Sequence, residues 1–138
     1  MKGIIVLFLV VSSFVHSQNW SPITSVPTIG RDDAVAFSLN GFGFIVTGNL
    51  NGFAESNKLF QYDPNTNSWT EKAVFPGIAR QYSSVFTVHN KAYVIGGYSE
   101  SGLALKDVWE YDGFTDTWTQ KNDFPGLARW HATGTSIR

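Results

Sequence analysis

The sequence predicts an all-β fold built from one four-stranded antiparallel sheet that is repeated along the chain. The first observation is an internal repeat of 49 residues that needs no gap. The second is a series of short β-forming runs separated by turn sequences, and the third is the lack of a helical period after the N-terminus. The repeated residues include Trp20, Trp69 and Trp118; Pro27, Pro76 and Pro125; Arg31, Arg80 and Arg129; and the pairs Phe37 with Phe86 and Gly48 with Gly97.

The composition agrees with one folded domain and argues against several classes of function. The 138 residues carry a net charge of -1, which disfavours a nucleic-acid binder, because such proteins need a basic face. Aromatic residues make up 15% of the chain, which argues against intrinsic disorder. The chain has no cysteine, so it can form no disulfide, thiolate metal site or cysteine nucleophile.

Residues 1–17 have the features of a cleaved secretory signal peptide. A positively charged start precedes an unbroken apolar run at residues 4–11, and Val15-His16-Ser17 suits a signal peptidase that cleaves before Gln18. The apolar stretch is too short to cross a bilayer, which needs about 20 residues. We therefore expect a protein that is secreted or at the cell surface, with no membrane span after removal of the signal.

Each copy of the repeat is predicted to contain four short strands. The first copy places them at residues 34–39, 42–46, 59–62 and 69–73, and the second at 83–88, 92–95, 108–111 and 118–121. Turn sequences such as Asn40-Gly41 and Asp112-Gly113 lie between them, because these residues favour tight reversals. Four strands in about 50 residues predict one antiparallel sheet per repeat.

The second copy resembles the kelch repeat. Its arginine is followed by a strand, by Tyr93 to Gly97, by a loop, by Tyr111-Asp112 and by Trp118, in the order found in that repeat. The resemblance covers nearly all of residues 20–138. It implies a β-propeller of four-stranded antiparallel blades around a central channel, with about two and a quarter blades present.

Two further features refine the resemblance. The motif Phe-Pro-Gly-x-Ala-Arg, at residues 75–80 and 124–129, is similar to the secreted bacterial branch of the family. In the first copy Thr47-Gly48 replaces the glycine pair, and we expect no damage to the fold, because threonine suits the end of a strand. Gly48 and Gly97 end strands where a side chain would clash.

The repeats divide the chain into blades. After the signal, residues 18–138 form a partial kelch propeller with repeats at about 31–73, 80–121 and 129–138, and residues 20–26 match an orphan outer strand. Propellers close with about four to eight blades. We therefore expect an N-terminal fragment of a longer propeller, whose missing blades complete the ring. Self-assembly of several short chains into one ring is the alternative.

The repeated aromatic residues are predicted to hold the blades together. Trp69 and Trp118 begin the outermost strand of their copies, and we expect them to wedge that strand against its neighbour or against the next blade. Tyr62 and Tyr111 each add an apolar ring with a hydroxyl that can satisfy a buried backbone group.

The sequence contains no catalytic constellation. It has no nucleophile-elbow or phosphate-loop motif, and no cofactor is expected. His89 and His131 lie too far apart in the sequence to indicate a metal site. Asp63, Asn65 and Asn67 resemble the start of a calcium loop, but later positions lack the required Gly and Glu, so a turn is favoured. We therefore predict no metal and lean towards a protein that is not an enzyme.

A candidate ligand site lies directly after the repeated arginines. There the copies differ, which frees these positions for a ligand, and in kelch propellers this part of the blade lies near one mouth of the channel. The candidate residues are Arg80, Gln81, Tyr82, Arg129, Trp130 and His131. Because neighbouring strand residues face opposite sides, one residue of each pair should face the mouth. Tyr82 and Trp130 are favoured, since aromatic faces supply much contact energy. The alternative is that the arginines are structural and bond carbonyls of the neighbouring blade.

Two functions follow from the resemblance. The first is a secreted, non-catalytic scaffold whose partner is a protein or carbohydrate ligand. The alternative is a sugar-acting enzyme, such as a sialic-acid mutarotase or a galactose-oxidase-like protein, with catalytic residues in the missing blades. Propellers carry both kinds of function, so the fold does not separate them. Copper oxidases of this type need a cysteine cross-link, which this chain cannot supply.

Overall fold

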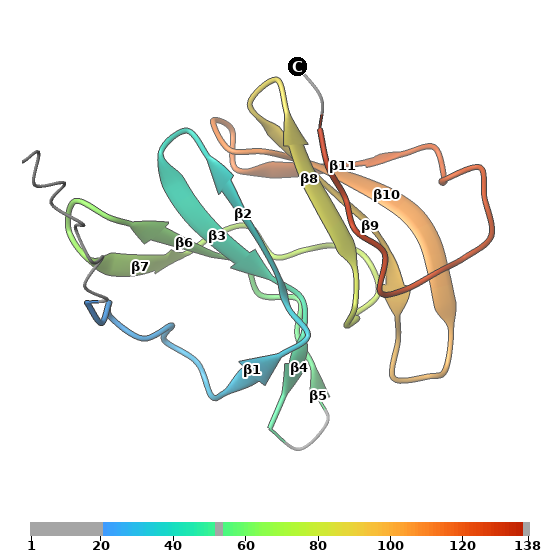
Figure 1. The fold of residues 1–138 in the computed structure, drawn as a ribbon, viewed down its shortest axis with the longest axis horizontal. Coiled ribbons are helices and arrows are strands. Elements are labelled where there is room, and N and C mark those ends of the chain that lie inside the picture. The colour runs from blue at the N-terminus through green and yellow to red at the C-terminus, as the bar shows by residue number, and fades with distance from the viewer. Residues whose placement is uncertain (1–20, 52–53, 137–138) are drawn as a thin grey trace, which may run out of the picture.

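The computed structural model describes residues 21–51 and 54–136, and the predicted all-β fold is confirmed within them (Figure 1). The first blade is a four-stranded antiparallel sheet in the order β2-β3-β6-β7. Its strands are β2 (Val35–Leu39), β3 (Phe42–Val46), β6 (Phe60–Asp63) and β7 (Ser68–Glu71). No helix of the described residues is long and apolar enough to cross a membrane.

The second blade repeats this arrangement with longer strands. Its order is β8-β9-β10-β11, and its strands are β8 (Ser84–Val88), β9 (Lys91–Tyr98), β10 (Ala104–Asp112) and β11 (Thr117–Lys121). β9 runs on through the glycine pair at residues 96–97, where the sequence predicted its end. A register shift between Leu105 and Val108 interrupts its pairing with β10.

A small third sheet lies beside the first blade. It consists of β1 (Arg31–Asp32), β4 (Asn49–Leu50) and β5 (Ala54–Glu55), in the order β1-β4-β5. β4 and β5 lie between the predicted second and third strands of the first copy, in a segment that the sequence predicted to be a loop. β1 and β4 pair because the first residues after the repeated arginine run antiparallel to the chain that leaves β3.

The two blades pack face to face through aromatic side chains. β2 and β8 are edge strands of their sheets, and Figure 1 shows them side by side where the two blades meet. Phe37 and Phe44 of the first blade stack with their ring centroids 4.9 Å apart, and Tyr111 of the second blade meets Phe44 edge-on at 5.7 Å. All three residues are buried, so the core lies at the junction between the blades.

A repeated clamp ties each blade to the chain segment before it. The Trp118 indole donates to the Ala73 carbonyl at 3.0 Å, while the Ala73 amide donates to an Asp116 carboxylate oxygen at 3.0 Å. That oxygen also accepts from the Tyr111 hydroxyl at 2.8 Å. The role predicted for Trp118 is confirmed, because its ring also packs edge-on against Phe75, in the segment that joins the two blades, with the ring centroids 5.1 Å apart.

The first blade carries the same clamp. Trp69 donates to the Thr24 carbonyl at 2.7 Å, and Asn67 accepts from the Thr24 amide at 2.9 Å and from the Tyr62 hydroxyl at 2.9 Å. Thr24 therefore occupies the place that Ala73 has in the next repeat. Residues 21–26 pair with no strand in the described part of the chain, so the orphan strand at 20–26 stays a prediction. The predicted signal at 1–17 lies outside the described residues.

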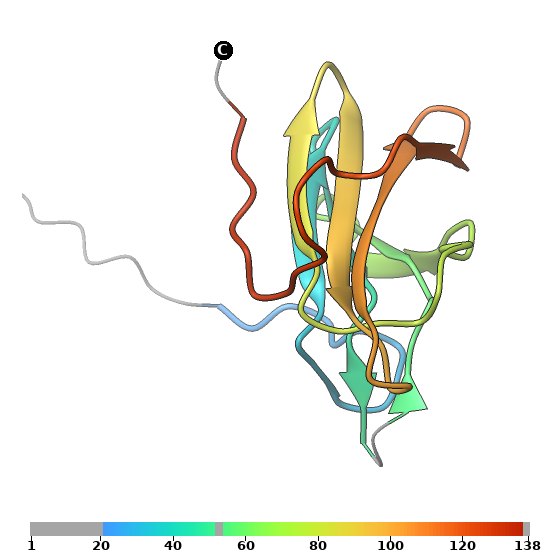
Figure 2. The same cartoon turned by 90° about the vertical axis from the view of Figure 1, so that its right-hand side faces the viewer.

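The start of the third repeat lies along the second blade, as Figures 1 and 2 both show. The Gly97 amide donates to the Arg129 carbonyl at 2.9 Å, as the Gly48 amide donates to the Arg80 carbonyl at 2.8 Å. A side chain at Gly134 would lie only 2.6 Å from the Val85 carbonyl oxygen, so this segment runs close against β8.

The expectation for Thr47 is wrong in its physical detail. Thr47 has a φ of +61°, in the left-handed region, and is fully buried. Its counterpart Gly96 has a φ of +58°. A branched side chain is strained in this conformation, so threonine is tolerated here rather than suited to the position.

Candidate functional site

The second residue after each repeated arginine has the same unusual backbone. Asp33, Tyr82 and His131 have φ values of +52°, +58° and +55°. Aspartate and histidine are enriched in this left-handed region, whereas a tyrosine there is uncommon. The Tyr82 amide donates to the Asp33 carbonyl at 3.1 Å, and the His131 amide donates to the Tyr82 carbonyl at 3.1 Å. These bonds link three successive repeats before their innermost strands begin.

The side chains at this position contact one another. The rings of Tyr82 and His131 lie 3.9 Å apart between centroids, tilted by 45°. A hydrogen bond to the Asp33 carboxylate raises the pKa of the Tyr82 phenol, and partial burial and the negative charges of Asp33 and Asp32 raise it further.

The first residue after the arginine lies beside the end of β9 instead. Gln81 and Tyr98 exchange two backbone hydrogen bonds, of 3.0 and 2.9 Å. The Trp130 ring packs on the Tyr98 ring with centroids 5.0 Å apart, and Trp130 remains 45% exposed. Tyr82 and Trp130, the two favoured residues, thus occupy different positions of the repeat and contact different neighbours. Here we call Asp33, Tyr82, Tyr98, Trp130 and His131 the mouth surface.

Arg80 does not belong to this surface. Its side chain is fully buried, and its guanidinium donates to both carboxylate oxygens of Asp107, at 2.5 and 2.7 Å. It also donates to the carbonyls of Gly96 and Ile78 and stacks over the Phe75 ring at 4.9 Å. Arg80 is therefore a structural residue, as the alternative interpretation of the repeated arginines held. The groups that it bonds, however, belong to its own blade and to the segment before it, not to a neighbouring blade.

Arg129 is exposed, although it repeats part of this arrangement. It donates to the Leu127 carbonyl at 3.1 Å and stacks over the Phe124 ring at 4.6 Å. The glycine of the repeated motif explains the packing. A side chain at Gly77 or Gly126 would come within 2.8 Å of both the aromatic ring and the guanidinium. The motif is therefore a stacking unit that fixes the arginine, and Arg129 borders the mouth surface.

Sequence reasoning missed two members of the mouth surface. Asp33 was not among the candidates, because no glycine signals its left-handed backbone. Tyr98 was not among them either, because it follows the end of the strand predicted at 92–95. The 49-residue alignment could have found Asp33, because it shares the repeat position of Tyr82 and His131. No group of three or more metal-ligating side chains occurs in residues 21–51 and 54–136.

Comparison with known proteins identifies the repeat. Residues 79–125 match the family described as the Kelch motif. A solved structure described as "Structure of YjhT" is similar to this chain with a TM-score of 0.71 and 19% identity, over 81% of this chain. The chain spans 44% of the length of that protein. No curated protein matches the sequence. The protein thus carries a kelch repeat and has the fold of part of a kelch-repeat β-propeller, as the sequence predicted.

Proposed function

We propose that the protein is a secreted kelch-type propeller that binds a protein or glycan ligand through the mouth surface, without catalysing a reaction in this part of the chain. One observation carries the proposal. Three successive repeats hold chemically different side chains, Asp33, Tyr82 and His131, at one left-handed position. Backbone strain of this kind gathers at ligand sites, where the surrounding structure maintains it.

The chemistry of the mouth surface supports binding. Trp130 and Tyr98 offer aromatic faces, which stack on sugars or apolar side chains and dominate contact energy at recognition sites. Asp33 offers a carboxylate beside Tyr82, and His131 and Tyr82 offer polar ring atoms. Stacking faces beside a few oriented polar groups are the usual composition of a ligand site.

The binding proposal is tested with the full-length protein on a glycan array and in affinity capture from the native surroundings of the protein. The variants Trp130→Ala and His131→Ala should each weaken retention of the same ligand by about tenfold, as expected for the loss of about 1–2 kcal/mol of contact energy. Phe114→Ala serves as the matched control, because Phe114 is an exposed aromatic residue in the β10–β11 turn. A ligand retained equally by wild type and both mouth variants contradicts the proposal.

Export is part of the proposal and is tested separately. The protein is expressed with its own leader in a secreting host, and the N-terminus of the exported material is sequenced. We expect it to start at or near Gln18. Membrane-embedded material that retains Met1 contradicts export by a cleaved signal.

A sugar-acting enzyme is the second candidate. The contact of a phenol with an imidazole and a carboxylate, in Tyr82, His131 and Asp33, favours it, because such groups can pass a proton. The full-length protein is assayed by NMR for interconversion of sialic-acid anomers. A rate above the spontaneous one that Tyr82→Phe abolishes supports the enzyme, whereas a spontaneous rate with intact ligand binding supports the scaffold.

A further inference from the structure

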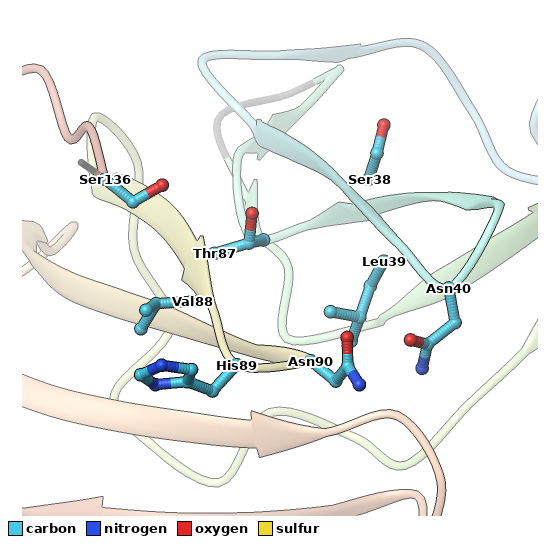
Figure 3. Close-up of a pocket in the computed structure, with 8 residues that line it drawn as sticks. All are labelled: Ser38, Leu39, Asn40, Thr87, Val88, His89, Asn90 and Ser136. Atoms are coloured by element: carbon cyan, nitrogen blue, oxygen red, sulfur yellow. The ribbon is translucent and has the colours of Figure 1, made fainter. Parts of the chain in front are cut away.

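A second candidate site lies at the opposite end of the innermost strands. The mouth surface precedes β8, whereas this site is built around the ends of β2 and β8 and the turns that follow them. It is a cavity of about 660 Å³ (Figure 3). The polar residues that line it are Ser38, Asn40, Thr87, His89, Asn90 and Ser136.

The repeat places a hydroxyl at one level of this cavity in all three copies. Ser38, Thr87 and Ser136 are spaced 49 residues apart, and Figure 3 shows them in a row along one side of the cavity. Strand alternation explains their direction. In β2 the neighbours Phe37 and Leu39 are buried in the core, so Ser38 points to the other side.

A second level holds amide and imidazole groups. Asn40 and His89 occupy the same repeat position, at the start of the turns after β2 and β8, and Asn90 follows His89. Figure 3 shows these side chains along the opposite side from the hydroxyl row, with Leu39 and Val88 between the two rows. The cavity therefore has two polar rims separated by an apolar strip.

The lining selects for an uncharged ligand. Among the described residues that line the cavity there is no Asp, Glu, Lys or Arg, so none of them neutralises an anion or supplies the carboxylates that a divalent cation prefers. Hydroxyl and amide groups each offer both hydrogen-bond donors and acceptors, and the His89 imidazole adds polar ring atoms. Each sugar hydroxyl both donates and accepts hydrogen bonds, so it is matched by a lining that offers donors and acceptors. The apolar strip suits the C–H face of a sugar ring. The volume lies in the range of small-molecule sites.

We propose that this cavity, named here the hydroxyl site, binds an uncharged sugar of one or two rings. The hydroxyl row holds one edge of the sugar, and the Asn40 and His89 rim holds the other edge. The site is separate from the mouth surface, so the two ends of the innermost strands recognise different ligands.

The test is an NMR titration of the full-length protein with glucose, galactose, N-acetylglucosamine and maltose. We expect at least one of these sugars to bind with a Kd below about 10 mM. Thr87→Val and Ser38→Ala should each weaken that binding by about five- to tenfold, the loss expected for one hydrogen bond. Thr119→Val is the matched control, because Thr119 is an exposed threonine on β11 outside the cavity.

The outcomes separate this proposal from the function proposed above. Sugar binding that the hydroxyl-site variants weaken, and that Thr119→Val and Trp130→Ala leave unchanged, supports the hydroxyl site. Binding that Trp130→Ala alone weakens overturns it and favours the mouth surface as the sugar site. Failure of all four sugars also overturns it. Ser38 lies on an exposed position of β2, so Ser38→Ala keeps the test valid where Thr87→Val fails to fold.

Discussion

The two complete blades follow one repeat but treat their arginine differently. In the second blade Arg80 is fully buried and forms a bidentate pair with Asp107. In the first blade Lys58 stands at the position of Asp107, and the half-buried Arg31 bonds two carbonyls and the Ser56 hydroxyl instead. The same repeat position therefore holds an ion pair in one blade and a set of neutral acceptors in the other.

The difference extends to the backbone around each arginine. Arg80 satisfies all three of its nitrogens, whereas the Nε of Arg31 is buried without a partner. Gly96 meets the left-handed backbone without strain, but Thr47 does not, and the Thr47 hydroxyl is also buried without a partner. The first blade thus keeps the repeat architecture with poorer local chemistry, so we expect the second blade to be the more stable.

The largest expected effect comes from removing the carboxylate of the second blade. Asp107→Ala leaves the Arg80 charge buried and unpaired, and we expect the free energy of unfolding to fall by about 3–5 kcal/mol. Ser56→Ala removes the side-chain partner of Arg31 and should cost about 1 kcal/mol. Urea denaturation of the full-length protein measures both. Equal losses for the two variants would mean that the ion pair does not distinguish the blades.

Acid should weaken the second blade first. Burial raises the pKa of Asp107, but the hydrogen bonds and charge of Arg80 outweigh it and leave the pKa below its ordinary value. A hydrogen bond from Lys91, opposed by burial and helped by Tyr93 and Lys121, lowers the pKa of Glu110 to about 2. Carboxylates with lowered pKa values stabilise the folded state above their unfolded pKa, and this contribution is lost as the pH falls towards their folded pKa.

The melting temperature should therefore stay level from pH 7 to about 5 and fall steadily from about pH 4.5 towards 2, the window between the unfolded and folded pKa values. In Glu110→Gln the fall should be shallower, because one of the responsible carboxylates is absent. Glu71→Gln is the control, since the carboxylate of Glu71 forms an exposed pair with Lys58 in the first blade. A pH profile of Glu110→Gln that matches wild type would contradict this account.

The next prediction concerns the residue with a left-handed backbone that is threonine in the first blade, Thr47, and glycine in the second, Gly96. Thr47→Gly should raise the free energy of unfolding by about 1 kcal/mol, because it relieves strain and removes a buried hydroxyl without a partner. Gly96→Thr should lower it by about 2 kcal/mol, since a side chain there would lie 2.7 Å from the Arg129 carbonyl oxygen. Thermal melts of both variants give the comparison. Destabilisation by Thr47→Gly would show that threonine is adapted to the first blade.

Most of the blade architecture could be predicted from the sequence. The 49-residue spacing and the turn residues locate the four strands of each blade, because these signals are local and are present twice. For the clamp around Trp118 and Tyr111, the packing of Trp118 was predicted correctly, but the prediction that the tyrosine hydroxyl bonds a backbone group is wrong, because the Tyr111 hydroxyl donates to the Asp116 carboxylate. The acceptor is Asp116 in the second blade and Asn67 at the same position of the first blade. Because the two residue types differ, a comparison of the two copies for identical residues does not reveal this shared role.

The candidate site was predicted only in part. Aromatic character favoured Tyr82 and Trp130, but the two residues occupy different positions of the repeat. The left-handed backbone at Tyr82 also breaks the alternation of an extended strand, and no glycine signals it. The rule that identical positions serve the blade and variable positions serve a ligand also fails once. Asp107 and Lys58 differ between the copies, yet Asp107 is structural, because its partner Arg80 is buried inside the blade.

The smallest effect is expected from a substitution that introduces the carboxylate of the second blade at the same position of the first blade. Lys58→Asp places an acid where Asp107 stands in the repeat, next to the guanidinium of Arg31, whose pKa is lowered by burial. A half-exposed ion pair contributes little to stability. We therefore expect the free energy of unfolding of Lys58→Asp to exceed that of Lys58→Ala by about 0.5 kcal/mol. Lys58→Ala is the matched control, because both variants lose the exposed pair with Glu71. Equal stability of the two variants in urea would show that the ion pair of the second blade depends on more than this one residue, and that the wider strand packing around Arg80 must be transferred with it.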